Sequence, residues 1–288
     1  MIIETDIGND PDDFFTLCYL IAAGVKIEAI VIVPGTPAQV AITKLVLEEC
    51  GLNIPVGVSN VDKVNGNVND MHSKIVHENR SCTWLAGVKH DGYGHDIIAS
   101  VANDESEFLI IGPATNIGRH LSNKLDFKAS KATMQGGFLP YSLHDHDVVM
   151  LDSFKGKSSV PTFNLNGNRE AGLQFLSADI SRRNMVGKNV CHTVLFDKDI
   201  HQKMSYNNHP ASILFKMGMD IYLKKHSDKK FHDPVAAVCH LHPEIGTWVR
   251  GKTVKEGAGW TTERRENGDF ILADIDRERF WEHITQWT

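Results

Sequence analysis

Short apolar runs alternate with helix-like patterns along this chain. The apolar run that begins at Ile2 leads into a polar turn, and an apolar pattern of helical character starts at Phe14. Strand-like runs separated by helical patterns are typical of a mainly parallel sheet with helices packed on it. Because the chain has no repeat, low-complexity tract or Pro/Ser-rich linker, we predict one α/β domain, an open and mainly parallel sheet flanked by helices, over residues 1–288.

The same pattern predicts the remaining elements. Strands are expected over 26–33, 54–58, 108–111, 132–135 and 189–196, and extended strands joined by glycine-rich turns over 248–273. Helices are expected over 37–50, 115–121, 170–176, 210–225, 234–239 and 276–287. Two segments show little regular pattern: residues 60–94 are expected to form a functional loop or lid, and residues 139–159 a polar loop.

Composition narrows the class of protein without identifying a function. Hydrophobic residues make up 42% of the chain and charged residues 23%, which is ordinary for a globular protein. The formal net charge of −6 gives no reason to expect nucleic-acid binding. No apolar run approaches the roughly 20 residues of a membrane span, and no signal segment is predicted, so we expect no membrane association. Five scattered cysteines without CxxC spacing favour reduced thiols, a cytoplasmic location and no zinc site.

The turn after the first strand holds a dense group of carboxylates. Asp6, Asp10, Asp12 and Asp13 lie within it, and carboxylates so close repel one another unless a cation neutralises them. Oxygen ligands suit Ca²⁺ or Mg²⁺, and ligands of open α/β sheets bind at the carboxyl ends of strands. The alternative is that these residues only cap the helix, which fits Asp10 before a proline but does not explain Asp6. We therefore predict a metal site.

Four polar segments, each following a predicted strand or opening a predicted helix, resemble the motifs of one family. The segments are Thr5-Asp6-Ile7-Gly8 with Asp12-Asp13, Gly112-Pro113-Ala114-Thr115-Asn116, Thr162-Phe163-Asn164 with Glu170-Ala171, and Phe231-His232-Asp233-Pro234. In this collinear order, which runs from Ile3 to Trp281, the chain resembles the inosine-uridine-preferring nucleoside hydrolases. The resemblance implies a Rossmann-like nucleoside hydrolase fold and an enzyme of nucleoside salvage. Its expected reaction is hydrolysis of the N-glycosidic bond of a ribonucleoside, or a modified nucleoside, to free base and ribose.

The resemblance also implies a metal site and a general base. One Ca²⁺ per chain would be held by the carboxylates of Asp6, Asp13 and Asp233 and by the main-chain carbonyl of Thr115. Asp6 would also activate a calcium-bound water. The chemistry is consistent with this assignment, because cleavage of the bond passes through an oxocarbenium-like sugar that nearby carboxylates stabilise.

Further roles concern the substrate. By resemblance, Asp12 and Asn164 would hold ribose hydroxyls. His232 is the candidate donor to the leaving base, and the alternative is that it only orients Asp233. The expected partner is a small-molecule nucleoside, and the family commonly forms homodimers or homotetramers.

The sequence departs from the family pattern in several places. The turn is two residues longer than usual, so we align Asp12-Asp13 with the family pair and keep Asp10 as an alternative ligand. Thr162 stands where most members carry a sugar-binding glutamate, and it is kept as a substrate-binding candidate although its neutral hydroxyl is a weaker acceptor. Thr36 stands where asparagine is common, and it would either bind substrate or cap a helix. Val88 aligns with a histidine of pyrimidine-preferring members, and His90 is the candidate substitute for it.

Three other groups allow two interpretations each. The tract His144–Asp147 resembles a metal tract, but a solvated loop is favoured over a substrate contact. Trp84 and Trp260 would either stack on a leaving base or pack in the interior. The pairs Lys224-Lys225 and Lys229-Lys230 are predicted to be solvated charges.

Two rival functions remain open from the sequence. A Mg²⁺ phosphohydrolase would need an Asp-x-Asp turn, but Glu4 occupies the first of these positions. A non-catalytic relative that binds calcium and ribose is consistent with the departures at Thr162 and Val88. Base specificity is expected to depend on residues 60–94 and 201–227.

Overall fold

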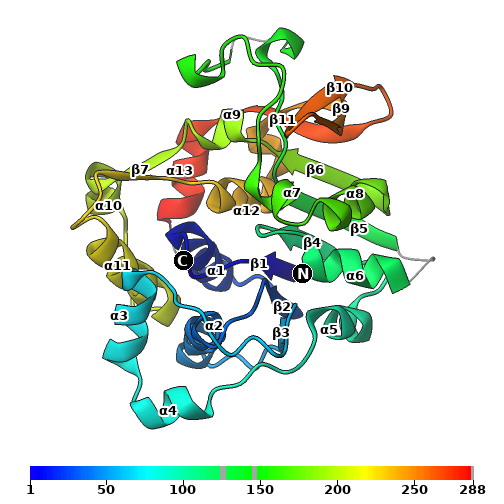
Figure 1. Ribbon diagram of the computed structural model, residues 1–288. Helices are drawn as coiled ribbons and strands as arrows, with labels where there is room; N and C mark the ends of the chain where they lie inside the picture. The colour runs from blue at the N-terminus through cyan, green and yellow to red at the C-terminus, as the bar shows by residue number, and fades with distance from the viewer. Residues whose placement is uncertain (124–127, 145–147, 287–288) are drawn as a thin grey trace.

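The computed structural model describes residues 1–123, 128–144 and 148–286. In the described chain, nine strands form one sheet in the order β10-β9-β11-β6-β5-β4-β1-β2-β3, and β7 and β8 form a separate pair (Figure 1). The strands are β1 (Ile2–Thr5), β2 (Ala29–Ile32), β3 (Val56–Val58), β4 (Glu107–Ile110), β5 (Lys128–Gln135), β6 (Asp179–Val186), β7 (Leu195–Asp197), β8 (Asp228–Lys230), β9 (Gly246–Glu256), β10 (Gly259–Arg264) and β11 (Asp269–Ile275).

The helices alternate with these strands along the chain. They are α1 (Pro11–Ala22), α2 (Pro37–Glu49), α3 (Asp70–Asn79), α4 (Cys82–Gly87), α5 (Gly94–Val101), α6 (Thr115–Asn123), α7 (Phe163–Gly167), α8 (Arg169–Ser177), α9 (Lys188–Cys191), α10 (Lys198–Lys203), α11 (Pro210–Tyr222), α12 (Asp233–Leu241) and α13 (Arg277–Thr285). None of the helices among the described residues has the length and apolar character to cross a membrane.

The sheet is mainly parallel and changes its direction of winding at β1. β1 pairs in parallel with β2 on one side and with β4 on the other. The chain passes from β1 to β2 and β3, and then returns to the opposite side of β1 to form β4, β5 and β6. Only the edge formed by β9 and β10 is antiparallel. The predicted fold class is confirmed, and such a reversal leaves a crevice at the carboxyl ends of the central strands.

Helices cover both faces of the sheet. Helices α1, α2, α12 and α13 lie on one face, with α11 packed outside α1, and α5, α6 and α8 lie on the other (Figure 1). Strand β2 is buried along its whole length, as expected for a central parallel strand with a continuous apolar sequence. The two hydrophobic cores therefore hold the strand ends, and the turns that follow them, in fixed positions.

Two glycines bring the functional turns close to the sheet. Gly8 has a φ of 126°, a left-handed conformation that a side chain would strain, and it allows the chain to turn sharply from β1 toward α1. Gly112 follows β4, and a Cβ there would lie 2.6 Å from the main-chain nitrogen of Asp6. The turns after β1 and β4 therefore lie in direct contact.

The prediction of one irregular segment over residues 60–94 is wrong, because the segment contains α3 and α4. Asn69 caps α3 by accepting a hydrogen bond from the main-chain N–H of His72 at 3.2 Å. This helix buries Met71, Ile75 and Val76 at helical spacing among polar residues. The narrow apolar face of α3 explains why the mixed composition concealed it.

The strand predicted over residues 189–196 is also wrong. Its apolar residues form the short helix α9 and only the start of β7, whereas the strand of the main sheet is β6, upstream. The first half of β6 is largely exposed and carries charged residues, so it lacks an apolar run. Helices α5 and α10 were likewise not predicted. Within residues 139–159, the described part contains only the short 3₁₀ turns Tyr141–Leu143 and Asp152–Phe154.

Candidate active site

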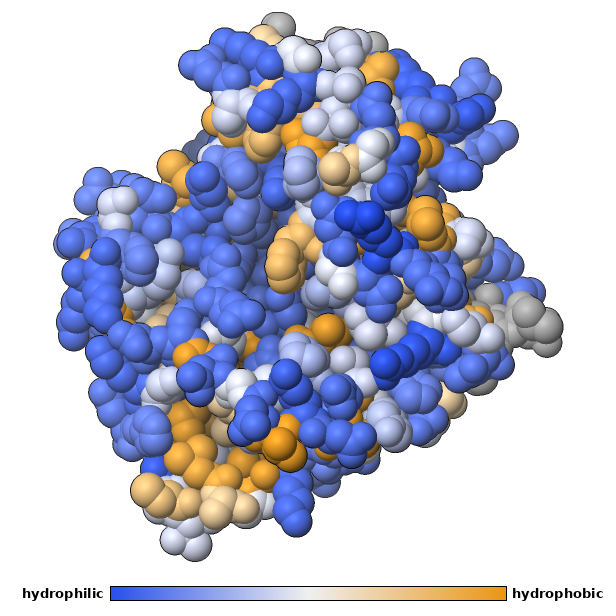
Figure 2. Space-filling view, viewed as in Figure 1, coloured by the Kyte–Doolittle hydropathy of each residue, from blue (hydrophilic) through white to orange (hydrophobic). Residues whose placement is uncertain are grey.

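A cavity of about 660 Å³ opens where the central strands end. Figure 2 shows this hollow, bordered mainly by hydrophilic residues. The turn after β1, the ends of β4 and β5, and the starts of α1, α7 and α12 contribute its walls. The lining residues are Asp6, Asn9, Asp10, Pro11, Asp12, Asp13, Asn69, Ile111, Gln135, Phe163, Asn164, Lys188, His192, Tyr222, His226, His232 and Asp233. The cavity thus occupies the crevice that the reversal of winding at β1 creates.

Carboxylates from two helix starts meet in this cavity. Asp12 and Asp13 lie in the first turn of α1, and Asp233 begins α12. One oxygen from each of the three lies within 4.8 Å of the others, and all three residues are buried. Asp6, directly after β1, lines the same cavity. The structure therefore brings together the three carboxylates assigned to calcium and the one assigned to ribose.

The pKa values of most of these carboxylates are raised by burial and by their neighbours. Burial, followed by the charge of Asp12, raises the pKa of Asp6 to about 7. Burial and the neighbouring carboxylates raise the pKa of Asp13 and of Asp233 well above the ordinary value. A buried, oxygen-only group whose members resist ionisation beside one another is a donor set that suits a hard divalent cation. The residues present therefore fit a calcium ion.

Thr115 lies outside this group of side chains. It opens α6, where its hydroxyl accepts a hydrogen bond from Asn168 at 3.3 Å. It is not among the lining residues, and the metal-binding role of its carbonyl stays a prediction. The turn around it is fixed by Glu4, whose carboxylate accepts hydrogen bonds from the main-chain N–H groups of Asn116 at 2.6 Å and Ile117 at 3.1 Å.

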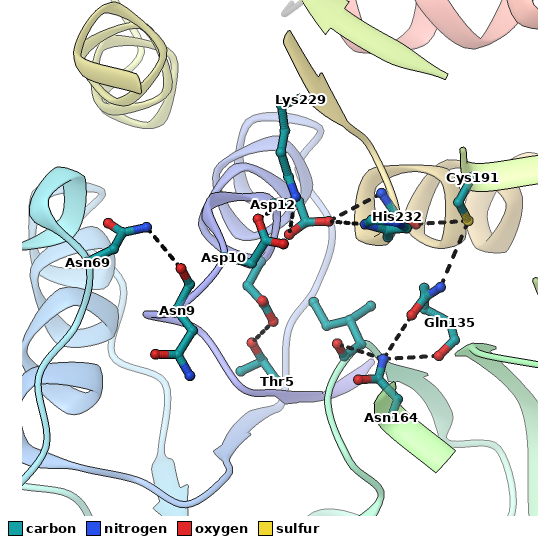
Figure 3. Close-up of polar contacts among 12 residues, drawn as sticks. Thr5, Asn9, Asp10, Asp12, Asn69, Gln135, Asn164, Cys191, Lys229 and His232 are labelled. Atoms are coloured by element: carbon teal, nitrogen blue, oxygen red, sulfur yellow. Dashed lines mark hydrogen bonds and ion pairs between the residues drawn. The ribbon is translucent and has the colours of Figure 1, made fainter. Parts of the chain in front are cut away.

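Asp12 differs from the other carboxylates because basic groups surround it. Burial raises its pKa, but the charge of Lys229 and the hydrogen bond from His232 lower it below the ordinary value. Lys229 lies 3.4 Å from Asp12 Oδ1 and also contacts Asp10 (Figure 3). The prediction that Lys229 is solvated is wrong, since its side chain is only 6% exposed. Its partners are distant in the sequence, so no local signal indicates this burial.

The alternative role of Asp10 as a metal ligand stays a prediction. Its side chain groups with Asp12 and His232 rather than with Asp13 and Asp233. It forms an ion pair with Lys229 at the rim of the cavity and is 52% exposed. It precedes α1 as the N-cap residue but makes no side-chain capping hydrogen bond.

Asn164 has a fixed orientation toward the cavity. Its Nδ2 donates to the main-chain oxygen of Ile111 at 3.1 Å and to both oxygens of Gln135 at 3.0 Å. Figure 3 shows that these contacts turn its Oδ1 away from Gln135. Thr162 precedes α7, is buried, and does not line the cavity. Gln135, at the end of a predicted strand, was missed as a site residue although its position in the sequence would have indicated it.

Histidines line the cavity beside Asp12. His232 lies with its ring Nδ1 3.2 Å from Asp12 Oδ2, and its ring meets that of His192 at a centroid distance of 5.1 Å. Burial and the neighbouring His232 lower the pKa of His192 to about 3, so it is neutral at physiological pH. Tyr222 and His226 stack at 4.2 Å at the end of α11 and also line the cavity. Tyr222 and His226 fall within residues 201–227, one of the regions expected to determine base specificity. No feature of the sequence indicated that His192 would line the cavity.

Three further substrate-binding candidates, like Thr162, do not line the cavity. Thr36 is the N-cap of α2 and forms a reciprocal capping box with Gln39. His90 accepts a hydrogen bond from the main-chain N–H of Gly92 at 3.1 Å. Trp260 is fully buried, and its indole N–H donates to Asn166 at 2.9 Å.

Trp84 and His144 are also absent from the cavity lining. Trp84 donates to the carboxylate of Glu48 at 2.9 Å, remote from the cavity lining. Of the tract His144–Asp147, residues 145–147 lie outside the described residues, and His144 contacts the main-chain oxygen of Leu139 at 3.4 Å.

Taken together, the sheet order and the buried carboxylates define a doubly wound α/β protein with an acidic ligand site at its switch point. Residues 1–282 match the family model described as inosine-uridine preferring nucleoside hydrolase, and the chain belongs to this family. It is therefore identified as an N-glycosyl hydrolase of the nucleosidase type. A comparison with curated protein sequences gives no match.

Solved structures support the fold at low sequence identity. A plant nucleoside hydrolase has a TM-score of 0.71 and 17% identity, with 99% of this chain and 97% of that chain covered. An inosine-guanosine nucleoside hydrolase has a TM-score of 0.73 and 16% identity, with 99% and 96% covered. The inosine-uridine preferring nucleoside hydrolase from Bacillus anthracis has a TM-score of 0.68 and 15% identity, with 99% and 97% covered.

Proposed function

We propose that this chain hydrolyses the N-glycosidic bond of a ribonucleoside to free base and ribose, with one Ca²⁺ bound among Asp6, Asp13 and Asp233. The observation that carries the proposal is the buried group of carboxylates beside a cavity at the end of β1. Such a group is costly to ionise in the folded chain and so needs a functional reason to persist. When bound, Ca²⁺ would supply the positive charge that keeps these carboxylates ionised and that acidifies a coordinated water.

Asp6 is the proposed general base. Asp6 lines the cavity directly after β1, so its carboxylate is placed to accept a proton from a water molecule held near the metal site. The carboxylates around the cavity also favour the positive charge that develops on the sugar as the bond to the base breaks.

Asp12 and Asn164 are the proposed contacts for ribose hydroxyls. Lys229 and His232 hold Asp12 ionised, so it can accept hydrogen bonds from a sugar. Asn164 uses its amide nitrogen on Ile111 and Gln135, which leaves its oxygen as the acceptor for substrate. Two acceptors fixed from different elements would hold the sugar in one orientation and so reduce the entropic cost of reaction.

His232 is the proposed donor to the leaving base. Its Nδ1 is occupied by Asp12, so Nε2 is the ring atom left for a base. The alternative role, orientation of Asp233, is compatible with its position directly before that residue. A substitution to glutamine would separate the two roles, because a donor role predicts the largest loss for substrates whose leaving base needs a proton.

A panel of purine, pyrimidine and modified ribonucleosides tests this proposal, with free base measured by chromatography. We expect base release from at least one nucleoside, loss of release in EDTA, and recovery with Ca²⁺. The variant Asp6→Asn should bind Ca²⁺ more weakly and release little base. Tight nucleoside binding without base release would instead support the non-catalytic alternative, which the departures at Thr162 and Val88 suggest. Release of phosphate from nucleotides or sugar phosphates would support a phosphohydrolase.

A further inference from the structure

Lys229 is a buried cation that pairs with Asp10 and Asp12, two residues of the cavity wall, and the proposed reaction gives it no contact with substrate. We propose that Lys229 is a positioning residue that fixes Asp12 for ribose recognition, with Asp10 of the lengthened turn as its second anchor. This inference rests on the proposed function, because it requires Asp12 to be a carboxylate that accepts ribose hydroxyls.

The two oxygens of Asp12 are held from different elements. Oδ1 lies 3.4 Å from Nζ of Lys229, which belongs to β8. Oδ2 lies 3.2 Å from both the main-chain nitrogen and the ring Nδ1 of His232, which precedes α12. Asp12 itself belongs to α1, so three elements fix one carboxylate (Figure 3). Free rotation of that carboxylate is therefore blocked, and its remaining acceptor directions are set before substrate arrives.

The position of Lys229 is fixed by its strand. Lys229 lies opposite Phe196 in the antiparallel pair of β7 and β8, and Phe196 is fully buried against Phe231. The adjacent Lys230 is exposed, as the alternation of a strand requires. The strand thus directs one lysine toward Asp10 and Asp12 and the next one toward solvent, which provides a matched pair for experiment.

Asp10 gives Lys229 a second counter-charge besides Asp12. A buried ammonium without a counter-charge is unfavourable, and hydrogen bonds from a sugar would draw on the charge of Asp12. Asp10 keeps the ammonium paired from the rim of the cavity. The turn that carries Asp10 is itself anchored, because Asn69 donates from Nδ2 to the oxygen of Asn9 at 3.1 Å and from its main-chain nitrogen to Gly8 at 2.8 Å. The contacts of Asn9 and Asp10 therefore give this lengthened turn a structural role.

The test combines substitutions of the lysine with removal of sugar hydroxyls. The activity of wild type, Lys229→Met and Lys230→Met is measured on a ribonucleoside that wild type hydrolyses and on its 2′-deoxy and 3′-deoxy forms. We expect Lys229→Met to raise KM for the ribonucleoside about 10- to 100-fold, the range of a hydrogen bond to a charged group. The preference for ribose over the deoxy sugars should shrink by at least about fivefold, while Lys230→Met leaves both quantities unchanged.

Two further variants sharpen the assignment. Lys229→Arg keeps the charge and should restore KM to within about threefold of wild type, because a guanidinium reaches both carboxylates. Asp10→Asn removes only the outer anchor and should change KM less than Lys229→Met does. Lys229→Gln replaces Lys229→Met if the latter does not fold, as judged by circular dichroism and calcium-loaded melting.

The outcomes separate the inference from the function on which it rests. If Lys229→Met folds and keeps the wild-type preference for ribose, Lys229 does not position Asp12 and the inference is overturned. If neither neutral variant folds with Ca²⁺ present, the role is structural and the inference is likewise overturned. If wild type releases no base from any nucleoside, the proposed function has failed, and the inference fails with it.

Discussion

Removing the charge of Asp6 should stabilise the metal-free protein while abolishing its activity. Burial and Asp12 raise the pKa of Asp6 from 3.8 to about 7, so the folded state resists ionisation of this group. The pKa of Asp6 is higher in the folded state than in the unfolded state. The folded protein therefore keeps its full stability below about pH 4 and loses stability as the pH rises toward 7. The loss corresponds to about 2 kcal/mol at pH 5 and about 4 kcal/mol at pH 8. Asn at this position cannot ionise, so Asp6→Asn escapes the loss.

Urea denaturation in EDTA, followed by fluorescence, measures the effect. The free energy of unfolding of Asp6→Asn should exceed that of wild type at pH 8, and the excess should be about 2 kcal/mol smaller at pH 5. Asp104→Asn, at an exposed turn position, is the control and should leave the pH dependence unchanged. With Ca²⁺ present, the order should reverse, because the variant lacks one ligand. If metal-free Asp6→Asn is no more stable than wild type at pH 8, the carboxylates do not form the repulsive group described here.

Three further predictions test other parts of the account. Ca²⁺ should raise the melting temperature of wild type more at pH 8 than at pH 5. At the lower pH, protons compete with the ion for Asp13 and Asp233, whose pKa values are raised. An equal shift at the two pH values, measured by calorimetry, would contradict this. Trp260→Phe should lower the free energy of unfolding by about 1–3 kcal/mol without changing KM for any nucleoside, since the indole only packs and binds Asn166; a selective rise in KM would return Trp260 to the site. Thr36→Ala should cost about 1 kcal/mol through the lost cap of α2, again with KM unchanged.

The residues whose positions the sequence predicted correctly are those that directly follow a strand or open a helix. Asp6 follows a short apolar strand, and Asp12, Asp13 and Asp233 open helices, so each lies at the edge of the sheet where parallel strands end. A pattern of strands and helices is enough to predict that such side chains meet. The fold class follows from the same alternation.

The residues that the sequence placed wrongly depend on contacts between distant segments. Lys229 lies among charged residues, and only its pairing with Asp10 and Asp12 makes its burial favourable. The sequence left two interpretations of Trp260, stacking on the base or packing in the interior, and the packing of β10 places it in the interior. Family alignment is also weak evidence where this chain carries a different residue from the family. The alignment suggested a substrate contact for Thr36. Its capping box with Gln39, in contrast, is a local pattern that the sequence already contained.

The central claim is that one divalent ion among buried carboxylates allows this protein to hydrolyse a nucleoside. A calcium titration of EDTA-treated enzyme tests it, with bound ion measured by calorimetry and free base measured in the same samples. We expect no base release without metal, and activity that rises in proportion to the first equivalent of Ca²⁺ and then stays constant. Full activity in the metal-free enzyme, or a first equivalent that binds without restoring base release, would contradict it.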